Sequence, residues 1–250
     1  MAVTVPDVLL IPYGVAEWSP DGIALDGFAG RTLRLRTAFP CAAINRAGRE
    51  PLRFNNSRYD FGFAPAAAAG GEDEAAVLRE YLIGLCKPWY NVSVQFLDAY
   101  FRFAADAIEQ HMHVLTARLA PYAGLYDPKD FLFSAPKPLP RAHLHAPPPG
   151  ASAQAADMDA ADFLRVDFAF WLGNRLVAAH SAQSFLTPKR AKEHTDRLRL
   201  AGIDVHLFGP ADLAGDRAEK FFTRLLGPTA AFWDSEPLPA GPFRPALLEE

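Results

Sequence analysis

The sequence contains little cysteine and no long hydrophobic run. Cys41 and Cys86 are the two cysteines in 250 residues, and no CxxC motif or cysteine-rich zinc signature accompanies them. Such sparse cysteine predicts free thiols in a reducing compartment, so we expect a cytoplasmic protein. No apolar stretch approaches the ~20 residues that span a membrane, and residues 1–12 lack the basic region and cleavage site of a secretory signal. We therefore expect no membrane partner.

The signature motifs of several enzyme classes are also missing. The chain has no GxSxG elbow, no GxxxxGK[ST] loop and no GxGxxG motif, and Gly27-Phe28-Ala29-Gly30 is typical of a turn. The sequence therefore gives no support for an α/β-hydrolase, a P-loop NTPase or a dinucleotide-binding enzyme. The net charge of -4 and the pI near 6.0 argue against a protein that wraps nucleic acid over its whole surface. A local basic stripe is still compatible with them.

The composition is that of a globular protein, with 50% hydrophobic and 22% charged residues. Three regions are expected: a β-rich region at residues 1–70, a helical region at 71–130, and an α+β domain at 131–250 that ends in an extended tail. The low-complexity segment 64–71 separates the first two regions, and the proline-rich segment 134–140 leads into the third.

Local patterns predict the elements of the first two regions. Residues 32–37 alternate apolar and polar side chains, as a half-buried strand does, and shorter runs at 8–11, 53–54 and 59–63 also favour strands. A helix is predicted over 74–87. Pro88 interrupts it, and a second, long helix is predicted over 89–119.

The C-terminal region has the clearest pattern. Thr187 and Pro188 form a helix start, and Gly202 ends that helix. A helix between two strands implies a crossover, and therefore a parallel strand pair in a mixed sheet. The expected elements are, in order, strands at 141–145, 163–171 and 176–180, a helix at 188–201, a strand at 203–208 and a helix at 210–226.

This order, preceded by a long helix, resembles the α-β-β-β-α-β core of the PD-(D/E)XK nuclease family. The resemblance covers residues 140–227. Within the family, these residues are similar in particular to the small endonucleases related to the very-short-patch repair enzymes. The segments that carry it are 166–170, 176–180, 187–190 and 200–205. The resemblance implies a restriction-endonuclease-like C-terminal domain and a nucleic-acid partner, with DNA expected over RNA.

The family chemistry implies a metal site on the second and third strands. One carboxylate from each strand holds Mg²⁺, which polarises the phosphate and helps to generate the attacking hydroxide, and a lysine two residues further on assists. Asp167 matches the first carboxylate. His180 stands where glutamate is expected, and Ala182 where an acid or lysine is expected. The resemblance therefore implies Mg²⁺ as the cofactor of a degenerate site.

Three interpretations of this site stay open. In the first interpretation the site serves binding alone, as a nucleic-acid module or as the interaction or scaffold subunit of a larger complex, with a protein partner or as a homodimer. In the second the catalytic groups have moved, so that Asp167, Glu193 and Lys189 are catalytic and Asp167, His180 and Glu193 hold the metal of an endonuclease. In the third interpretation the fold differs or the site performs unrelated chemistry. Glu193 also fits a solvated helix face, where it would pair with Lys189 or Lys192.

Histidine and basic residues add two further expectations. His143 and His145 are two apart on a predicted strand, so they share a face and could approach Asp167 and His180 to form a transition-metal site. The alternative is an edge strand beside a proline-rich loop. The helix at 188–201 carries the concentrated basic stretch, which could follow a phosphate backbone or simply form a solvated helix face. Its cations are Lys189, Arg190, Lys192, Arg197 and Arg199.

Overall fold

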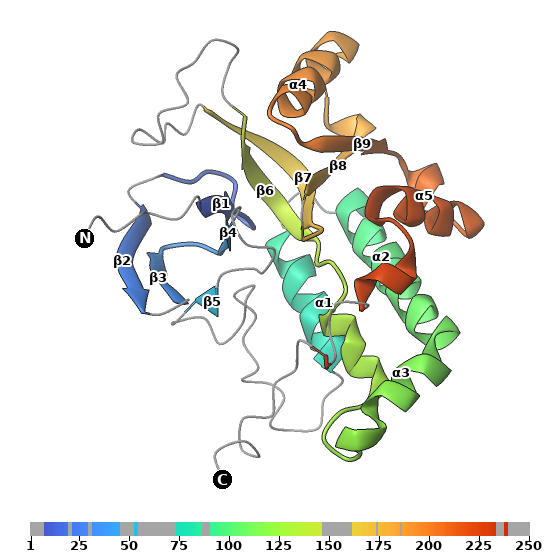
Figure 1. Cartoon of the computed structure of the whole chain (residues 1–250). Helices are drawn as coiled ribbons and strands as arrows, with labels where there is room; N and C mark the ends of the chain where they lie inside the picture. Colours follow the sequence, from blue (N-terminus) through green and yellow to red (C-terminus); the bar gives the residue numbers. More distant parts are fainter. Residues whose placement is uncertain are drawn as a thin grey trace.

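Two small sheets form the N-terminal part of the chain (Figure 1). Strand β1 (Val8–Pro12) pairs antiparallel with β4 (Cys41–Asn45). In the second sheet, β2 (Ile23–Ala29) and β3 (Thr32–Thr37) are antiparallel, and β3 is parallel to β5 (Arg53–Phe54). The strands predicted at 8–11, 32–37 and 53–54 are therefore confirmed.

The computed structural model of the chain describes ten segments. The predicted strand at 59–63 and the predicted linker at 64–71 lie outside them. The described residues are 8–19, 22–29, 32–45, 53–54, 74–86, 91–146, 162–173, 175–185, 187–233 and 238–239.

The helical region contains α1 (Glu74–Leu85), α2 (Asn91–Gln110) and α3 (Met112–Leu119). The single helix predicted over 89–119 is wrong, because the chain leaves helical geometry at His111, where φ is -102° and ψ is 7°. The imidazole Nδ1 of His111 donates a hydrogen bond to the carbonyl oxygen of Ala107 at 2.8 Å, and the ring lies 5.8 Å from that of Trp233. A contact with the distant C-terminal segment thus accompanies the break.

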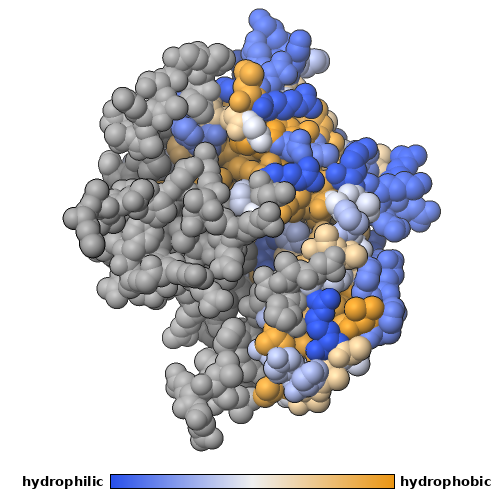
Figure 2. All heavy atoms as spheres, in the orientation of Figure 1, coloured by the Kyte–Doolittle hydropathy of each residue, from blue (hydrophilic) through white to orange (hydrophobic). Residues whose placement is uncertain are grey.

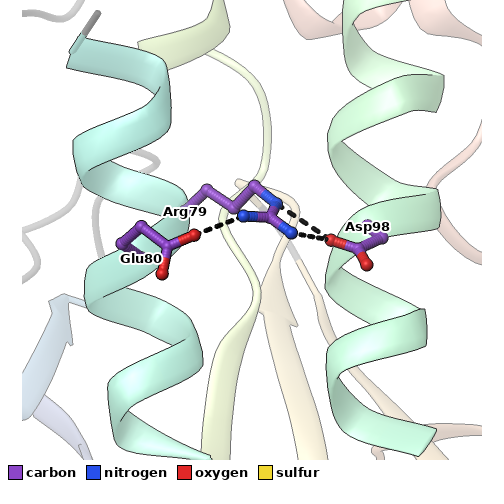
Figure 3. Close-up of polar contacts among 3 residues, drawn as sticks. All are labelled: Arg79, Glu80 and Asp98. Carbon is purple, nitrogen blue, oxygen red and sulfur yellow. Dashed lines mark hydrogen bonds and ion pairs between the residues drawn. The ribbon is translucent and has the colours of Figure 1, made fainter. Parts of the chain in front are cut away.

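An ion pair joins the first two helices at the surface (Figure 3). Arg79 of α1 donates from Nε to Oδ1 of Asp98 on α2 at 2.9 Å, and it also contacts its neighbour Glu80. Because the three side chains are partly solvated, such a pair contributes less than about 1 kcal/mol. The alignment of α1 with α2 therefore depends on their buried apolar faces rather than on this bridge.

The C-terminal half is built on a four-stranded mixed sheet with helices between and beside its strands, so the chain belongs to the α+β class. The order is β6 (Leu139–His145), β7 (Phe163–Trp171), β8 (Leu176–Ser181) and β9 (Asp204–Phe208). The first two pairs are antiparallel and the third is parallel. The crossover predicted between the third and fourth strands is therefore confirmed.

The crossover is helix α4 (Pro188–Leu200), which begins where the sequence predicts and ends one residue before the predicted end at 201. Oγ1 of Thr187 accepts a hydrogen bond from the Arg190 N–H at 3.3 Å, so it caps the first turn. After the helix, Gly202 has a φ of 78°, a left-handed conformation that costs glycine little.

The last helix differs from its prediction. Instead of one helix over 210–226, a 3-10 turn (Pro210–Leu213) is followed by α5 (Asp216–Leu226). Gly215 separates them with φ 51° and ψ -139°, which no helical residue adopts. The glycine was a visible signal for this break.

One side of the sheet packs against α2 and α5, which lie side by side (Figure 1). Phe96 of α2 is fully buried there; its ring stacks on Phe168 at 4.1 Å and meets Phe222 of α5 at 5.2 Å. A second buried cluster joins Leu198 of α4 and Ile11 of β1 to the sheet. The sheet is therefore held on both sides, and α4 is fixed over the strands that carry Asp167 and His180.

Cys41 and Cys86 are free thiols, as the sequence predicted, and burial raises the pKa of each to about 12. Both are therefore protonated at neutral pH and poor nucleophiles. Within the described part of the chain, no helix combines the length and apolar character needed to cross a bilayer.

Replacing Phe96 by alanine tests this core. The Phe96→Ala variant is expected to lose about 3–5 kcal/mol of unfolding free energy, because it removes a fully buried ring from between the sheet and α5. Urea unfolding followed by circular dichroism measures the loss. The control is Leu200→Ala, whose side chain is 74% exposed and whose loss should stay within about 0.5 kcal/mol. Equal losses in the two variants would contradict the packing described.

Candidate functional site

Asp167 and His180 meet across β7 and β8. The strands are antiparallel and Phe168 is paired with Ala179, so Asp167, which precedes Phe168, lies opposite His180, which follows Ala179. Oδ2 of Asp167 accepts hydrogen bonds from Nδ1 of His180 at 2.7 Å, from the Ser181 N–H at 2.6 Å and from Oγ of Ser184 at 3.1 Å. One carboxylate oxygen thus ties β7 to β8 and to the turn that follows.

This hydrogen bonding determines the charge of Asp167. Burial alone would raise the pKa of the carboxyl group, but the hydrogen bond and charge of His180, together with the bonds from Ser181 and Ser184, lower it below its usual value. Asp167 is therefore ionised at neutral pH and acts as an acceptor only. Nδ1 of His180 must then carry the hydrogen.

His194 of α4 lies against His180. The two imidazole rings are stacked at 5.1 Å with 26° between their planes, and Phe185 stands perpendicular to His180 at 4.4 Å. Burial, followed by the charge of His180, lowers the pKa of His194 to about 4, although a hydrogen bond with the Arg165 backbone acts in the opposite sense. His194 is therefore neutral at pH 7. Its buried Nε2 has no hydrogen-bond partner among the described residues.

These rings border a pocket of about 500 Å³. It is built from three parts of the chain: the N-terminal segment before β2, the sheet, and the turn and helix that follow β8. Aromatic rings, imidazoles and a few polar groups line it together. The lining residues are Ala16, Glu17, Trp18, His143, Phe163, Arg165, His180, Ser184, Phe185 and His194.

His143 contributes a further imidazole from β6. It is paired with Arg165 in the register, and its Nε2 donates a hydrogen bond to the Val15 carbonyl oxygen at 3.2 Å. Burial, then the charges of Arg165 and Arg141, lower its pKa, against the hydrogen bond to Val15 that raises it. His143 and His180 both line the pocket, whereas Asp167 is not among its lining residues.

Arg141 is the backbone outlier of the sheet. It lies between the paired residues Ala142 and Pro140, opposite Asp167, and its φ of 49° is in the left-handed region. A bulky residue adopts this conformation at a cost of about 1–3 kcal/mol, which is typical of positions that the surrounding structure constrains. The strain lies beside the carboxylate that organises the site.

The structure does not bring Glu193 and Lys189 into this arrangement. They form a solvent-exposed pair on α4, with 3.8 Å between Nζ of Lys189 and Oε1 of Glu193 and side-chain exposures of 86% and 64%. Their neighbour His194 faces the sheet instead. In the described residues, Asp167 is bonded to His180, Ser181 and Ser184, and to neither of these two groups.

The donor set does not fit Mg²⁺, a hard cation that takes several oxygen ligands. Oδ2 of Asp167 already accepts three hydrogen bonds, His180 offers a nitrogen, and Glu193 points to solvent. Among the described residues, no group of three or more His, Cys, Asp or Glu side chains lies close enough to hold a metal ion. His145, the other histidine of the expected transition-metal site, is not part of the pocket wall.

Several pocket residues were absent from the sequence-based candidates. Two of them could have been found, because Phe163 and Arg165 precede Asp167 by four and two residues on one strand and share its face. His194 also had a signal, since it lies one helical turn before the buried Leu198. Trp18 had none, because its contact with Phe163, at 4.5 Å between ring centroids, joins segments far apart in the sequence.

The sequence matches no family model, and no curated protein or solved structure is significantly similar to it. What the site can do therefore follows from its own geometry. An ionised carboxylate fixes one imidazole, two more imidazoles and three aromatic rings surround a hollow, and an arginine lies on its wall. Such a pocket suits a planar, polar ligand.

Neutralising Asp167 is expected to destabilise the protein. The Asp167→Asn variant should lose about 1.5–3 kcal/mol at pH 7, because three donors lose their charged acceptor. The pKa of Asp167 is lowered by folding, so its contribution is complete above the unfolded pKa of about 3.9 and is lost as the pH falls through the lower folded pKa. Urea unfolding from pH 7 to pH 3 should show the two proteins converging.

The matched control is Asp204→Asn, which removes an exposed carboxylate bonded to Arg175. Its loss should stay below about 1 kcal/mol. A loss from Asp167→Asn as small as that of the control, or one that does not change with pH, would contradict the hydrogen-bonding role of Asp167.

His194 should make the fold acid-sensitive. Because folding lowers its pKa from about 6.5 to about 4, the unfolded chain binds more protons between these values, and stability falls as the pH falls through this window. Each pKa unit corresponds to ~1.4 kcal/mol of unfolding free energy for a fully buried group. The ring is partly solvated, so we expect a smaller total loss of about 1–2 kcal/mol over this pH window. His194→Phe keeps a stacked ring without the titration. Its stability should change less between pH 6.5 and 4; an unchanged slope would count against this assignment.

Proposed function

We propose that the protein is nucleic-acid-associated and that its C-terminal half is a PD-(D/E)XK-like domain whose Mg²⁺ site is degenerate. The mixed sheet supports this proposal: a meander of β6, β7 and β8 is followed by the α4 crossover and the parallel strand β9. Helix α2 on one side and α4 near the other give the layers that such a domain has (Figure 1).

The observation that carries the proposal is the contact between Asp167 and His180. They occupy the second and third strands, where the nuclease family places its two metal-binding carboxylates, and they meet at 2.7 Å. We take this pair as the counterpart of that site, with an imidazole in place of the second acid. A carboxylate bonded to a histidine and two serines is suited to orienting that histidine rather than to holding Mg²⁺.

The surface of α4 supports nucleic acid as the partner. Lys189, Arg190, Lys192 and Arg199 are exposed, whereas the half-buried Arg197 donates from Nε to the Ala146 carbonyl oxygen at 2.5 Å. Figure 2 shows the corresponding upper part of the molecule as largely hydrophilic. Because the helix begins directly after the turn that holds Ser184 and Phe185, a phosphate backbone along it would pass the pocket.

Binding by a charge-matched pair of variants tests the proposal. Lys189→Gln with Lys192→Gln removes two charges from α4, and Arg217→Gln with Lys220→Gln removes two exposed charges from α5. Fluorescence anisotropy with labelled DNA and RNA should show weaker binding for the α4 variant and a salt dependence reduced by about one unit per lost phosphate contact. Equal effects of the two variants, or no binding to either nucleic acid at low salt, would overturn the proposal.

A cleavage assay separates the degenerate site from a migrated one. If Glu193 and Lys189 complete an endonuclease with Asp167, plasmid or RNA should be cleaved with Mg²⁺ or Mn²⁺, and Glu193→Gln should abolish cleavage. The degenerate site predicts no metal-dependent cleavage. Cleavage that Asp167→Ala leaves unchanged would show that the activity lies elsewhere.

The alternative, a non-catalytic interaction subunit or homodimer, is favoured by two exposed leucines. Leu200 at the end of α4 is 74% exposed, and Leu207 on the edge strand β9 is 43% exposed. An interface here predicts a dimer or complex by light scattering after size exclusion that Leu200→Ser with Leu207→Ser disrupts. A monomer that captures no partner would count against it.

A further inference from the structure

We propose that the pocket beside His180 binds one unpaired nucleotide, with its base against the aromatic walls and its phosphate toward Arg165. This inference rests on the proposed nucleic-acid association and deepens it, because it names the part of the nucleic acid that the site takes. It also assigns the pocket a binding role that needs no metal.

The size and walls of the pocket fit a single nucleotide. The hollow of about 500 Å³ is within the range of small-ligand sites. Trp18 and Phe163 are in edge-to-face contact at 4.5 Å, and Phe185 stands at 89° to the His180 ring at 4.4 Å. Aromatic faces of this kind bind bases by stacking, which is tolerant of sequence because every base has a π-face.

The imidazoles give the pocket hydrogen-bonding groups. Nδ1 of His180 is committed to Asp167 and Nε2 of His143 to the Val15 carbonyl, which leaves Nε2 of His180 and Nδ1 of His143 for a ligand. Burial lowers the pKa of His143, so its ring is neutral at pH 7 and its Nδ1 is an acceptor. An acceptor in an aromatic slot matches the N–H groups that an unpaired base exposes on its Watson–Crick edge.

Arg165 provides the charge that a phosphate needs. It lies on β7 between Phe163 and Asp167 and opposite His143 in the register, and its side chain is exposed. It is one of the residues that line the pocket, so its charge lies at the pocket wall. Oδ2 of Asp167 is hydrogen-bonded to His180, Ser181 and Ser184 rather than to Arg165.

The double helix does not fit the same surface. In a duplex the bases are stacked and paired, so neither a π-face nor a Watson–Crick edge is open to Phe185 or to the imidazoles. A single strand or an unpaired end can insert a base while its backbone follows Lys189 and Lys192 on α4. The pocket therefore predicts a preference for single strands that the basic helix alone would not produce.

The experiment compares labelled 12-nucleotide single strands, as oligo-dT and oligo-U, with a 12-base-pair duplex, at one fixed salt concentration. Phe185→Leu removes the half-buried ring on the pocket wall, and Phe185→Tyr restores a ring at the same position. The wild type and Phe185→Tyr should prefer the single strands, while Phe185→Leu should bind them about 5- to 150-fold more weakly, which corresponds to the ~1–3 kcal/mol of one base stack. Duplex binding should not change.

Two controls keep the result interpretable. Tyr122→Leu changes a 40% exposed ring far from the pocket wall and should leave all affinities unchanged. Lys189→Gln with Lys192→Gln should weaken single strands and duplex alike. The thermal midpoint of each variant, by circular dichroism, shows that the fold is retained.

The outcomes separate this inference from the proposed function. If single strands and duplex bind equally well, or if Phe185→Leu binds single strands like the wild type, the pocket assignment is overturned while nucleic-acid association stands. If no oligonucleotide binds, nucleic-acid association fails, and titration with AMP, GMP, CMP and UMP, followed by tryptophan fluorescence, decides the pocket. Saturable binding that Phe185→Leu abolishes would support a nucleotide pocket; no binding would overturn it.

Discussion

The hydrogen bonding of the Asp167 carboxylate is the interaction on which the candidate site depends. A single oxygen accepts from a side chain on the neighbouring strand, a backbone N–H at the end of that strand and a hydroxyl group in the next turn. These donors keep the carboxylate ionised despite its burial. The same bonds hold Ser184, and with it Phe185, beside the sheet, so the pocket wall and the orientation of His180 have one common cause.

The same hydrogen bonding joins a carboxylate and an imidazole at a place where two carboxylates would repel each other. In the proposed assignment, His180 of β8 stands in the position of the second metal-binding acid of the nuclease family. A fold does not determine its chemistry, so the pocket beside the pair, lined by Trp18, Arg165 and His194, is the basis on which a binding role is proposed.

Much of the C-terminal fold could be predicted from the sequence because its signals are local. Strand β7 follows from its run of β-formers, and α4 from the Thr187–Pro188 start and Gly202 stop. The break at His111 could not be predicted, since it involves the distant Trp233. Asp167 and His180 were identified as candidates, but their bond, the solvent-facing pair of Glu193 and Lys189, and the contribution of Trp18 depend on how separate segments pack.

The central claim is that ionised Asp167 fixes the ring of His180 on the pocket wall through a hydrogen on its Nδ1. Long-range ¹H–¹⁵N correlation spectra of the histidine side chains at pH 7 test it directly. The account predicts that Nδ1 of His180 carries a hydrogen, that Asp167→Asn weakens this preference, and that UMP shifts the Nε2 resonance of His180. An Nε2–H tautomer in the wild type, or a tautomer balance that Asp167→Asn leaves unchanged, would contradict it.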